Sequence, residues 1–184
     1  MRFALDTNVL VYAEGLDGVF HRDIAVATIS RLEEGIVIPA QVLGEFYNVL
    51  VRKAGLSRPE SHKTVLRWRR AYPILDTTAS AVELGAEFAT SNSFRIWDAI
   101  IVSVASQAGC RILLSEDMQD GFTWGGVTIV NPFAERPNPL LAALLEPQAA
   151  NSGFGLSRNG FTMVTPPQVK PSCMSSDKSN RQPA

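Results

Sequence analysis

The chain has 184 residues, of which 46% are hydrophobic and 19% charged, a composition typical of soluble globular proteins. With 17 Lys and Arg against 18 Asp and Glu, it lacks the basic excess of a protein that coats nucleic acid. The two cysteines are too few and too far apart for a disulfide scaffold or a Cys-based zinc site. Because no apolar run could span a membrane and no signal-like segment is evident, we expect a cytoplasmic protein without a membrane partner.

The charge divides unevenly along the chain. Residues 1–146 contain 13 basic and 17 acidic side chains, a net charge of −4, whereas residues 147–184 contain 4 basic and 1 acidic, a net charge of +3. The C-terminal segment also holds 5 Pro, 3 Gly and 6 Ser, but only five Leu, Ile, Val or Phe. Burial of so little apolar surface cannot offset the conformational entropy that an ordered segment would lose. We therefore predict one folded domain over residues 1–146 and a disordered tail over residues 147–184.

Within residues 1–146, short apolar runs alternate with segments of helical periodicity. In chain order, the predicted elements are strand Arg2–Leu5, helix Thr7–Ala13, helix Arg22–Glu34, strand Ile36–Ile38, helix Ala40–Ala54, helix Arg58–Ala71, strand Pro73–Leu75, helix Ala79–Thr90, helix Ile96–Ala108, strand Arg111–Leu114, strand Thr128–Val130 and helix Pro139–Leu145. Strands that alternate with helices indicate an α/β protein whose parallel sheet is covered on both faces.

Three acidic residues stand near strand ends or a helix start, and a fourth follows the second strand by a few residues. Asp6 directly follows the first strand, Asp117 lies just past the fourth, and Asp98 is in the first turn of a very apolar helix. Glu45 lies on the polar face of the helix after the second strand. Each has a structural explanation when taken singly: a helix N-cap for Asp6, a helix-dipole contact for Asp98, a solvated face for Glu45. Because chemistry in parallel sheets gathers outside the carboxyl ends of the strands, we expect these acids to share one rim.

Carboxylates held together repel one another, and a cation is the usual way to offset their charge. Oxygen ligands suit a hard ion such as Mg²⁺ or Mn²⁺. An ion of this kind, bound by acids and water, fits phosphoryl chemistry, since it can stabilise charge on a scissile phosphate. The four acids therefore predict a metal site that acts on phosphate esters.

The order of these motifs resembles that of the PIN-domain ribonucleases, and most of all the VapC-type toxins of bacterial toxin–antitoxin modules. The resemblance covers about residues 1–133 and rests on Phe3-Ala4-Leu5-Asp6-Thr7-Asn8, Glu45, Asp98 at the head of an Ala/Ile/Val-rich helix, and Leu114-Ser115-Glu116-Asp117. It implies a three-layer α/β/α sandwich around a short-stranded, mainly parallel central sheet. It also implies Mg²⁺- or Mn²⁺-dependent endonucleolytic cleavage of RNA.

The same resemblance assigns roles to individual residues. Asp6 and Asp98 look like the principal metal ligands, Glu45 and Asp117 complete the catalytic quartet, and the supporting polar groups are Thr7, Asn8 and Ser115. Asp117 matches the family's Ser/Thr-x-Asp position, although Glu116 and Asp120 lie close enough in sequence to be alternatives for the fourth acid. A small cognate antitoxin and a homodimer are further implications of the resemblance.

A basic face and an aromatic pair share the predicted helix Arg58–Ala71. Lys63, Arg67 and Arg70 repeat at i, i+4 and i+7 and could hold RNA phosphates, although a basic face on a surface helix is usually just solvated. Trp68 and Tyr72 could stack on bases, but their spacing fits a core stripe better.

Two other functions fit part of this pattern. A metal-dependent phosphatase of doubly wound fold could also use an Asp after the first strand, but the second Asp of a haloacid-dehalogenase-like pair is missing, since Asn8 stands two residues after Asp6. A PIN-like scaffold could instead act through binding alone.

Overall fold

The computed structural model describes residues 1–146. Within them, a six-stranded sheet has the order β3-β2-β1-β4-β6-β5. Its strands are β1 (Arg2–Leu5), β2 (Ile36–Pro39), β3 (Ile74–Leu75), β4 (Cys110–Leu114), β5 (Thr123–Trp124) and β6 (Val127–Val130). Every neighbouring pair is parallel except β5 and β6, which form an antiparallel hairpin. The predicted tail, residues 147–184, lies outside the described residues, so its disorder stays a prediction.

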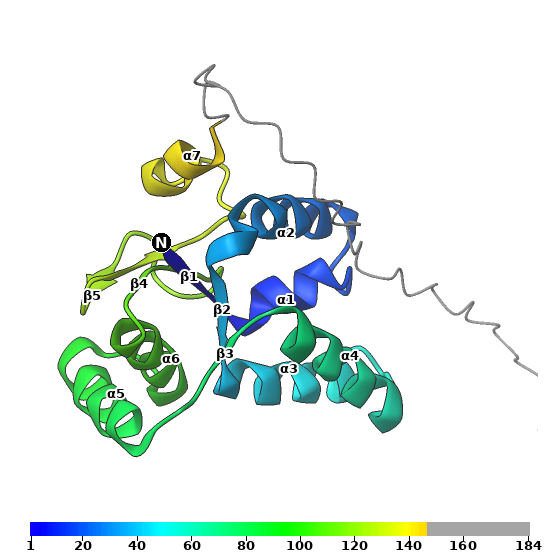
Figure 1. Cartoon of the computed structure of the whole chain (residues 1–184), viewed down its shortest axis with the longest axis horizontal. Coiled ribbons are helices and arrows are strands. Elements are labelled where there is room, and N and C mark those ends of the chain that lie inside the picture. Colours follow the sequence, from blue (N-terminus) through cyan, green and yellow to red (C-terminus); the bar gives the residue numbers. More distant parts are fainter. Residues whose placement is uncertain (147–184) are drawn as a thin grey trace, which may run out of the picture. The chain divides into compact units, whose positions relative to one another are not determined.

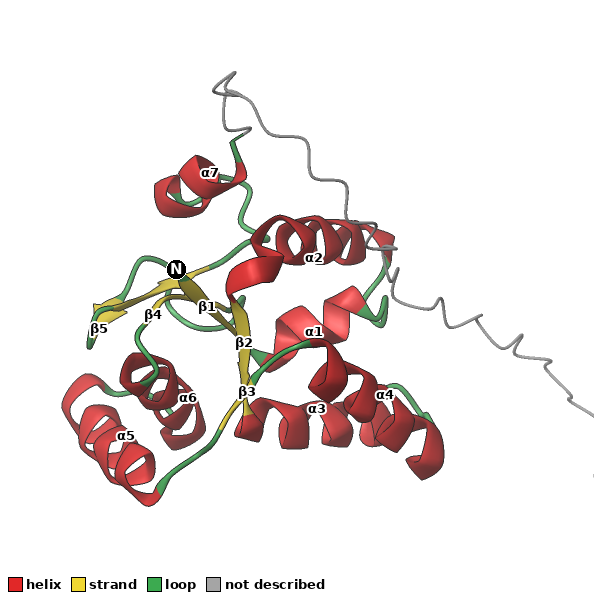
Figure 2. Cartoon of the chain, viewed as in Figure 1, coloured by secondary structure: helices red, strands yellow, loops and turns green. Residues whose placement is uncertain are grey.

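Helices cover the sheet on both sides. They are α1 (Thr7–Ala13), α2 (Val19–Leu32), α3 (Ala40–Arg52), α4 (Arg58–Ala71), α5 (Ala79–Asn92), α6 (Ile96–Gln107) and α7 (Pro139–Leu145), with a short 3₁₀ turn at Glu33–Gly35. Figures 1 and 2 show α5 and α6 below the strands and α2 and α7 above them. Helix α1 packs against α2 and α3, and α6 lies on β2, β4 and β6. This arrangement confirms the predicted α/β/α sandwich.

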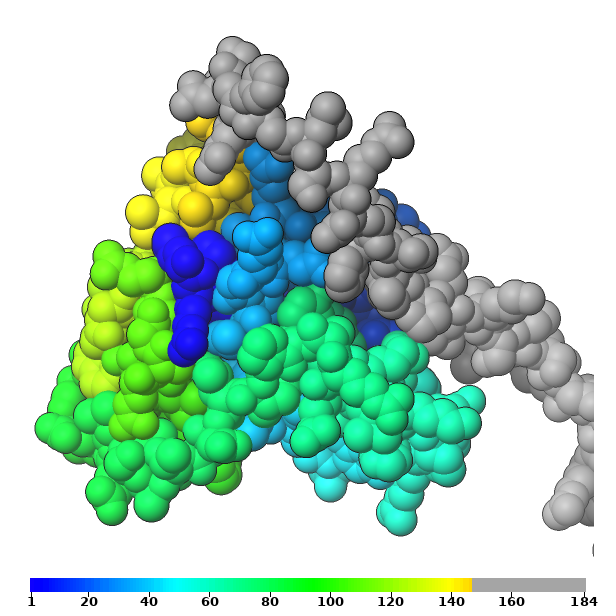
Figure 3. All heavy atoms as spheres, in the orientation of Figure 1, coloured from blue at the N-terminus to red at the C-terminus, as the bar shows by residue number. Residues whose placement is uncertain are grey.

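The central strands are buried because they are covered on both faces, as their continuous apolar sequences predict. In β1, Phe3, Ala4 and Leu5 are buried, and residues 112–114 of β4 are at most 1% exposed. Figure 3 shows the first residues of the chain, in dark blue, between the light-blue segment that leads into β2 and the green segment that leads into β4. In α6, every residue from Ala99 to Ala105 is buried, which confirms the central position expected of this apolar helix.

The predicted elements are all present, with small differences at their ends. The hairpin strand β5 was not predicted, because two residues are too few to show a strand pattern. Helix α2 begins three residues before the predicted start, directly after Gly18. Gly18 has a φ of +93°, a conformation that glycine adopts readily, and this turns the backbone just before the helix. It also ends two residues early, where Glu33–Gly35 tighten into the 3₁₀ turn.

Helix α4 begins with a complete capping box. The Ser57 hydroxyl accepts from the Glu60 backbone N–H, and the Glu60 carboxylate accepts from the Ser57 backbone N–H. Pro59 lies in the first turn, so this helix starts where the sequence predicts. Among residues 1–146, no helix is both long and apolar enough to cross a lipid bilayer.

Candidate active site

The register of the two central strands brings distant polar residues together at one edge of the sheet. Leu5 at the end of β1 pairs with Leu114 at the end of β4, and the Asp6 backbone N–H donates to the Leu114 carbonyl at 2.9 Å. The next residues, Asp6 and Ser115, therefore lie side by side although 109 positions separate them. This is the carboxyl edge at which the sequence predicts a site.

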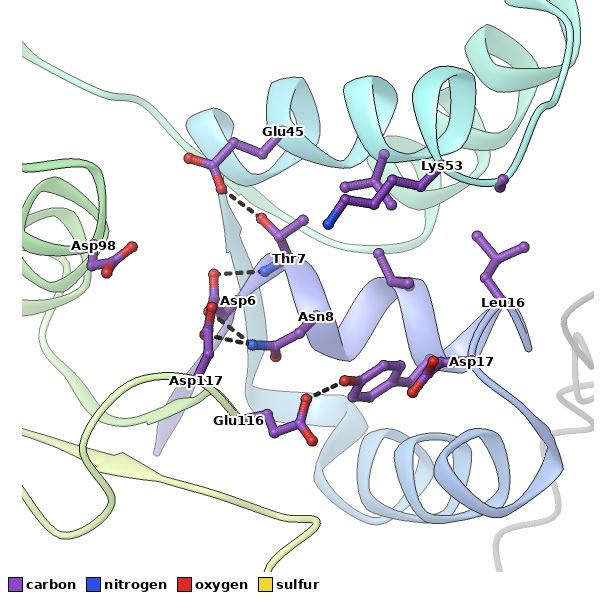
Figure 4. Close-up of a pocket in the computed structure, with 14 residues that line it drawn as sticks. Asp6, Thr7, Asn8, Leu16, Asp17, Glu45, Lys53, Asp98, Glu116 and Asp117 are labelled. Carbon is purple, nitrogen blue, oxygen red and sulfur yellow. Dashed lines mark hydrogen bonds between the residues drawn. The ribbon is translucent and has the colours of Figure 1, made fainter. Parts of the chain in front are cut away.

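A cleft of about 480 Å³ opens at this edge, and all four predicted acids line it (Figure 4). Asp6 comes from the end of β1, Glu45 from α3, Asp98 from the first turn of α6 and Asp117 from the loop after β4. The remaining residues that line the cleft are Thr7, Asn8, Val11, Tyr12, Leu16, Asp17, Val49, Lys53, Ala54 and Glu116. The fold thus gathers the predicted acids, which come from four separate segments.

Asp6 is the most constrained of these side chains. It is 5% exposed, and its carboxylate accepts from the Thr7 backbone N–H at 2.7 Å, which makes it the N-cap of α1. It also accepts from Ser115 Oγ at 2.8 Å and from Asn8 Nδ2 at 3.2 Å. The structural and functional interpretations of Asp6 are therefore compatible: the cap fixes a carboxylate that lines the cleft.

Asp117 shares these supporting groups with Asp6. Its Oδ1 accepts from Asn8 Nδ2 at 2.8 Å and lies 3.1 Å from Ser115 Oγ. A serine hydroxyl has one proton and can donate it to only one carboxylate at a time. Ser115 and Asn8 thus hold the carboxylates of Asp6 and Asp117 close together, but they only partly satisfy them.

Glu45 and Asp98 are positioned from the helices. The Glu45 carboxylate accepts from Thr7 Oγ1 at 2.9 Å and from Gln41 Nε2 at 2.8 Å. The same Gln41 amide donates to the backbone carbonyl of Trp97 at 3.1 Å, which ties α3 to the start of α6 beside Asp98. The Asp98 side chain itself is half-buried, and within residues 1–146 it forms no hydrogen bond or ion pair.

Burial and the nearby acidic charges raise the pKa of two of these carboxyl groups. Burial raises the pKa of Asp6 from 3.8 to about 7, hydrogen bonds from Ser115 and Thr7 oppose that rise, and the charges of Asp117 and Glu45 add to it. Burial also raises the pKa of Asp98, again with a contribution from Asp117, while Arg95 acts in the opposite direction. Without a counter-charge, the site favours keeping at least one of these carboxyl groups protonated.

The donors fit a hard divalent cation in their chemistry. Four carboxylates face one cleft, and carboxylate oxygens are the ligands that Mg²⁺ and Mn²⁺ prefer. In the described residues, however, no three His, Cys, Asp or Glu side chains are arranged to hold one ion as they stand. Thr7, Asn8 and Ser115 bridge the acids instead. Metal binding would therefore require these side chains to move.

Asp117 has two neighbours that the sequence leaves open as alternatives, and the contacts distinguish all three. Asp120 accepts from the Asn131 backbone N–H and from Asn138 Nδ2, and it does not line the cleft. Glu116 lines the cleft but accepts a hydrogen bond from the Tyr12 hydroxyl. Asp117 alone of the three shares Ser115 and Asn8 with Asp6, which favours it over its neighbours as the predicted fourth acid.

The basic face of α4 lies away from the cleft. Arg67 donates twice to the Glu14 carboxylate, at 2.8 and 2.9 Å, and this ion pair joins α4 to the end of α1. Lys63 and Arg70 are exposed, and neither they nor Arg67 lines the cleft. Arg67 is therefore paired with a residue of the fold itself. RNA binding by Lys63 and Arg70 stays a prediction.

The aromatic residues of α4 are part of the core. Trp68 is 7% exposed, packs on Phe46 and Tyr72, and donates its indole N–H to Glu14. This confirms the core-stripe interpretation of Trp68.

Sequence reasoning missed several residues that line or support the cleft. Lys53 stands eight residues after Glu45 and Val49 lies between them, so the three share roughly one face of α3. That spacing is a signal that could have identified Lys53. Tyr12 and Asp17 carry no comparable signal, because only packing places them in the cleft.

Comparison with known proteins finds one family. A profile described as PIN domain matches residues 3–119 of the chain. No curated protein sequence matches.

Several solved structures share the fold. VapBC from Salmonella typhimurium, bound to DNA, is 14% identical with a TM-score of 0.56, over 72% of this chain and 98% of the other. A toxin–antitoxin complex from Klebsiella pneumoniae is 17% identical with a TM-score of 0.54, over 70% and 96%. VapBC2 from Rickettsia felis, bound to a promoter DNA fragment, is 20% identical with a TM-score of 0.52, over 64% and 89%. At these identities the similarity concerns the fold.

Proposed function

The chain belongs to the PIN domain family, and from that premise we propose that it is a metal-dependent endoribonuclease that hydrolyses RNA phosphodiesters. We place it in the cytoplasm as the toxin of a type II toxin–antitoxin system. The observation that carries the nuclease proposal is the cleft in which Asp6, Glu45, Asp98 and Asp117 converge from four segments. Of these acids, Asp6 is buried and Glu45 and Asp98 are half-buried, and carboxylates in such positions are costly without a cation. A cation bound by acids suits phosphoryl transfer.

The proposed cation is Mg²⁺ or Mn²⁺, and the carboxylates of Asp6, Asp98, Glu45 and Asp117 would hold it. When bound, it would offset the charge of these acids and stabilise negative charge on the scissile phosphate. Thr7, Asn8 and Ser115 fix the carboxylates through the hydrogen bonds described above. Asp98 has no hydrogen-bond donor among the described residues, so its carboxylate is available to accept a proton from an attacking water.

Two partners belong to the proposal. We propose a small cognate antitoxin, and its support is that the fold is shared with the Klebsiella pneumoniae toxin–antitoxin complex and with VapBC complexes. We also propose a homodimer.

Each partner has its own test. Co-expression with a small open reading frame next to the gene, followed by purification through a tag on this chain, tests the antitoxin. Sedimentation of the purified protein tests the homodimer.

The nuclease proposal is tested by comparing wild type with Asp98→Asn on structured RNA, with Mg²⁺ or Mn²⁺ and with a chelator. Asp76→Asn is the matched control, because Asp76 is exposed and does not line the cleft. We expect wild type and Asp76→Asn to cut RNA only with the cation, and Asp98→Asn to lose at least about a hundredfold in rate.

The same assay separates the other candidate functions. Release of phosphate from small esters without RNA cutting would indicate a phosphatase. If the protein reacts with neither substrate, the result would favour a scaffold that acts through binding alone. Cleavage that Asp98→Asn retains in full would show that the acidic cleft is not the catalytic site.

A further inference from the structure

One positively charged side chain lines the acidic cleft. Of the described residues around it, six are acidic (Asp6, Asp17, Glu45, Asp98, Glu116 and Asp117), and Lys53 is the single Lys, Arg or His. Lys53 is exposed, and its ammonium forms no ion pair or hydrogen bond with any residue in 1–146. A lysine ammonium offers three hydrogen-bond donors, so all three are free for a ligand.

The shape of the cleft places Lys53 in the same groove as the four acids, toward its other end. The cleft runs between α1 and α3, because successive turns of both helices line it: Val11 and Tyr12 on α1, and Glu45 and Val49 on α3. A rise of about 1.5 Å per residue puts the Lys53 backbone roughly 12 Å along α3 from Glu45. Helical side chains lean toward the N-terminus, and Figure 4 shows the Lys53 ammonium directed back into the cleft toward Thr7.

The chemistry of this end of the cleft suits a nucleic-acid backbone. Beyond the acids, Val11, Leu16, Val49 and Ala54 give an apolar lining against which a sugar or base can pack. A cation above such a lining provides the charge that a phosphate requires. Because the acids would repel an RNA strand, a positive group at the far end of the cleft would also lower the cost of its approach.

We infer that Lys53 binds a phosphate of the RNA next to the scissile one, and that the strand lies along the groove between α1 and α3. This inference rests on the proposed ribonuclease function and adds a substrate-binding residue to it. A lysine near the end of a helix also interacts with the helix dipole, but Arg52, the last residue of α3 and next to Lys53, carries the same charge without lining the cleft. Arg52 therefore provides a matched control.

The experiment measures binding of a fluorescently labelled RNA, one that wild type cleaves, by anisotropy over a range of salt concentrations. All variants carry Asp98→Asn so that the RNA stays intact, and Lys53→Met is compared with Arg52→Met and Lys53→Arg. We expect Lys53→Met to weaken binding roughly three- to tenfold at low salt and to reduce the salt slope by about 0.7 to 0.9. Arg52→Met should leave both unchanged, and Lys53→Arg should retain most of the affinity.

A second readout uses enzymes with Asp98 intact. Lys53→Met should raise KM more than it lowers kcat, because the lost contact is made to the bound substrate as well as to the transition state. Thermal unfolding of Lys53→Met and Arg52→Met should agree, since each removes one charge from the end of α3.

The two proposals fail in different ways. If wild type cleaves RNA while Lys53→Met and Arg52→Met bind it equally well, the assignment of Lys53 is wrong and the nuclease proposal stands. If wild type cleaves no RNA with either cation, the nuclease proposal and the role of Lys53 fall together.

Discussion

Asp6 serves two purposes with one carboxylate. As the residue after β1 it caps α1, and as a residue of the cleft it lies within hydrogen-bond reach of Ser115 and Asn8. If this residue only capped the helix, Asn or Ser would serve equally well. An ionised, buried acid beside Asp117 and Glu45 adds repulsion that a cap does not need, so its charge is better explained by the proposed cation site.

Replacing Asp6 with Asn should therefore stabilise the protein when no metal is present. The variant keeps the cap but removes a buried charge from among other acids, so in the presence of a chelator we expect its melting temperature at neutral pH to rise. Each kcal/mol of repulsion removed should raise it by roughly 2–4 °C. The same variant should lose metal-dependent RNA cleavage. A melting temperature below that of wild type would contradict this account.

The pH dependence of that difference follows from the raised pKa. In the folded protein Asp6 ionises near pH 7, whereas in the unfolded chain it ionises near its ordinary pKa of 3.8. The unfolded state therefore releases this proton first, and metal-free wild type should lose stability as pH rises from about 4 to about 7. Asp6→Asn lacks this contribution, so the two proteins should differ least near pH 4 and most above pH 7. Asp76→Asn provides the control for removing an exposed charge.

At the level of elements, the α5–α6 pair depends on close contact at a glycine. Gly85 of α5 is buried, and a Cβ built there would lie 2.8 Å from Ile100 Cγ1 and 3.0 Å from the Ile100 backbone. Because backbone atoms of α6 are among the nearest neighbours, a side chain at this position would push the two helices apart. Asp98 is two residues before Ile100, so the spacing of this pair also affects the cleft.

Gly85→Ala should therefore destabilise the protein by about 1–3 kcal/mol, the usual cost of overpacking. Gly44 in α3 is the matched control, since a Cβ there would meet nothing within 4 Å. Gly44→Ala should stabilise by about 0.5–1 kcal/mol through helix propensity. Urea unfolding of both variants measures the two effects, and a neutral or stabilising Gly85→Ala would show that α5 and α6 are not in such close contact.

Helix α4 shows how packing decides the use of a charged face. Its i, i+4, i+7 basic repeat would suit RNA in isolation, but Arg67 is bound to Glu14, whose side chain is 5% exposed. A buried carboxylate needs such a partner, and Trp68 supplies a further donor. The pair holds α4 against α1, one wall of the cleft, so this helix supports the site through its position.

For the whole molecule, the distribution of charge favours a cation. Residues 1–146 carry a net charge of −4, and six of their acids line one cleft. RNA is itself a polyanion, so a net-negative nuclease needs positive charge at the point of contact. The proposed divalent ion and Lys53 are the two sources of that charge in the cleft.

Addition of Mg²⁺ or Mn²⁺ should therefore stabilise wild type, since the proposed cation site exists in the folded state and not in the unfolded chain. At about a hundred times the Kd, the gain is about 2.7 kcal/mol, or roughly 5–10 °C in melting temperature. The measurement is thermal unfolding with the cation and then with excess chelator, which should reverse the shift. Asp6→Asn should show little or none of it and Asp76→Asn all of it. An equal shift in Asp6→Asn would locate the ion elsewhere.

The sequence by itself determined the alternation of strands and helices and where the four acids stand relative to them, because both are local patterns that packing did not override. Only the tertiary structure placed Asp117 against Ser115, paired Arg67 with Glu14, and brought Lys53 into the cleft. These outcomes depend on contacts between residues far apart in the chain, such as Asn8 with Asp117 across 109 positions. Local periodicity carries no information about such contacts, since strand register and helix packing set them.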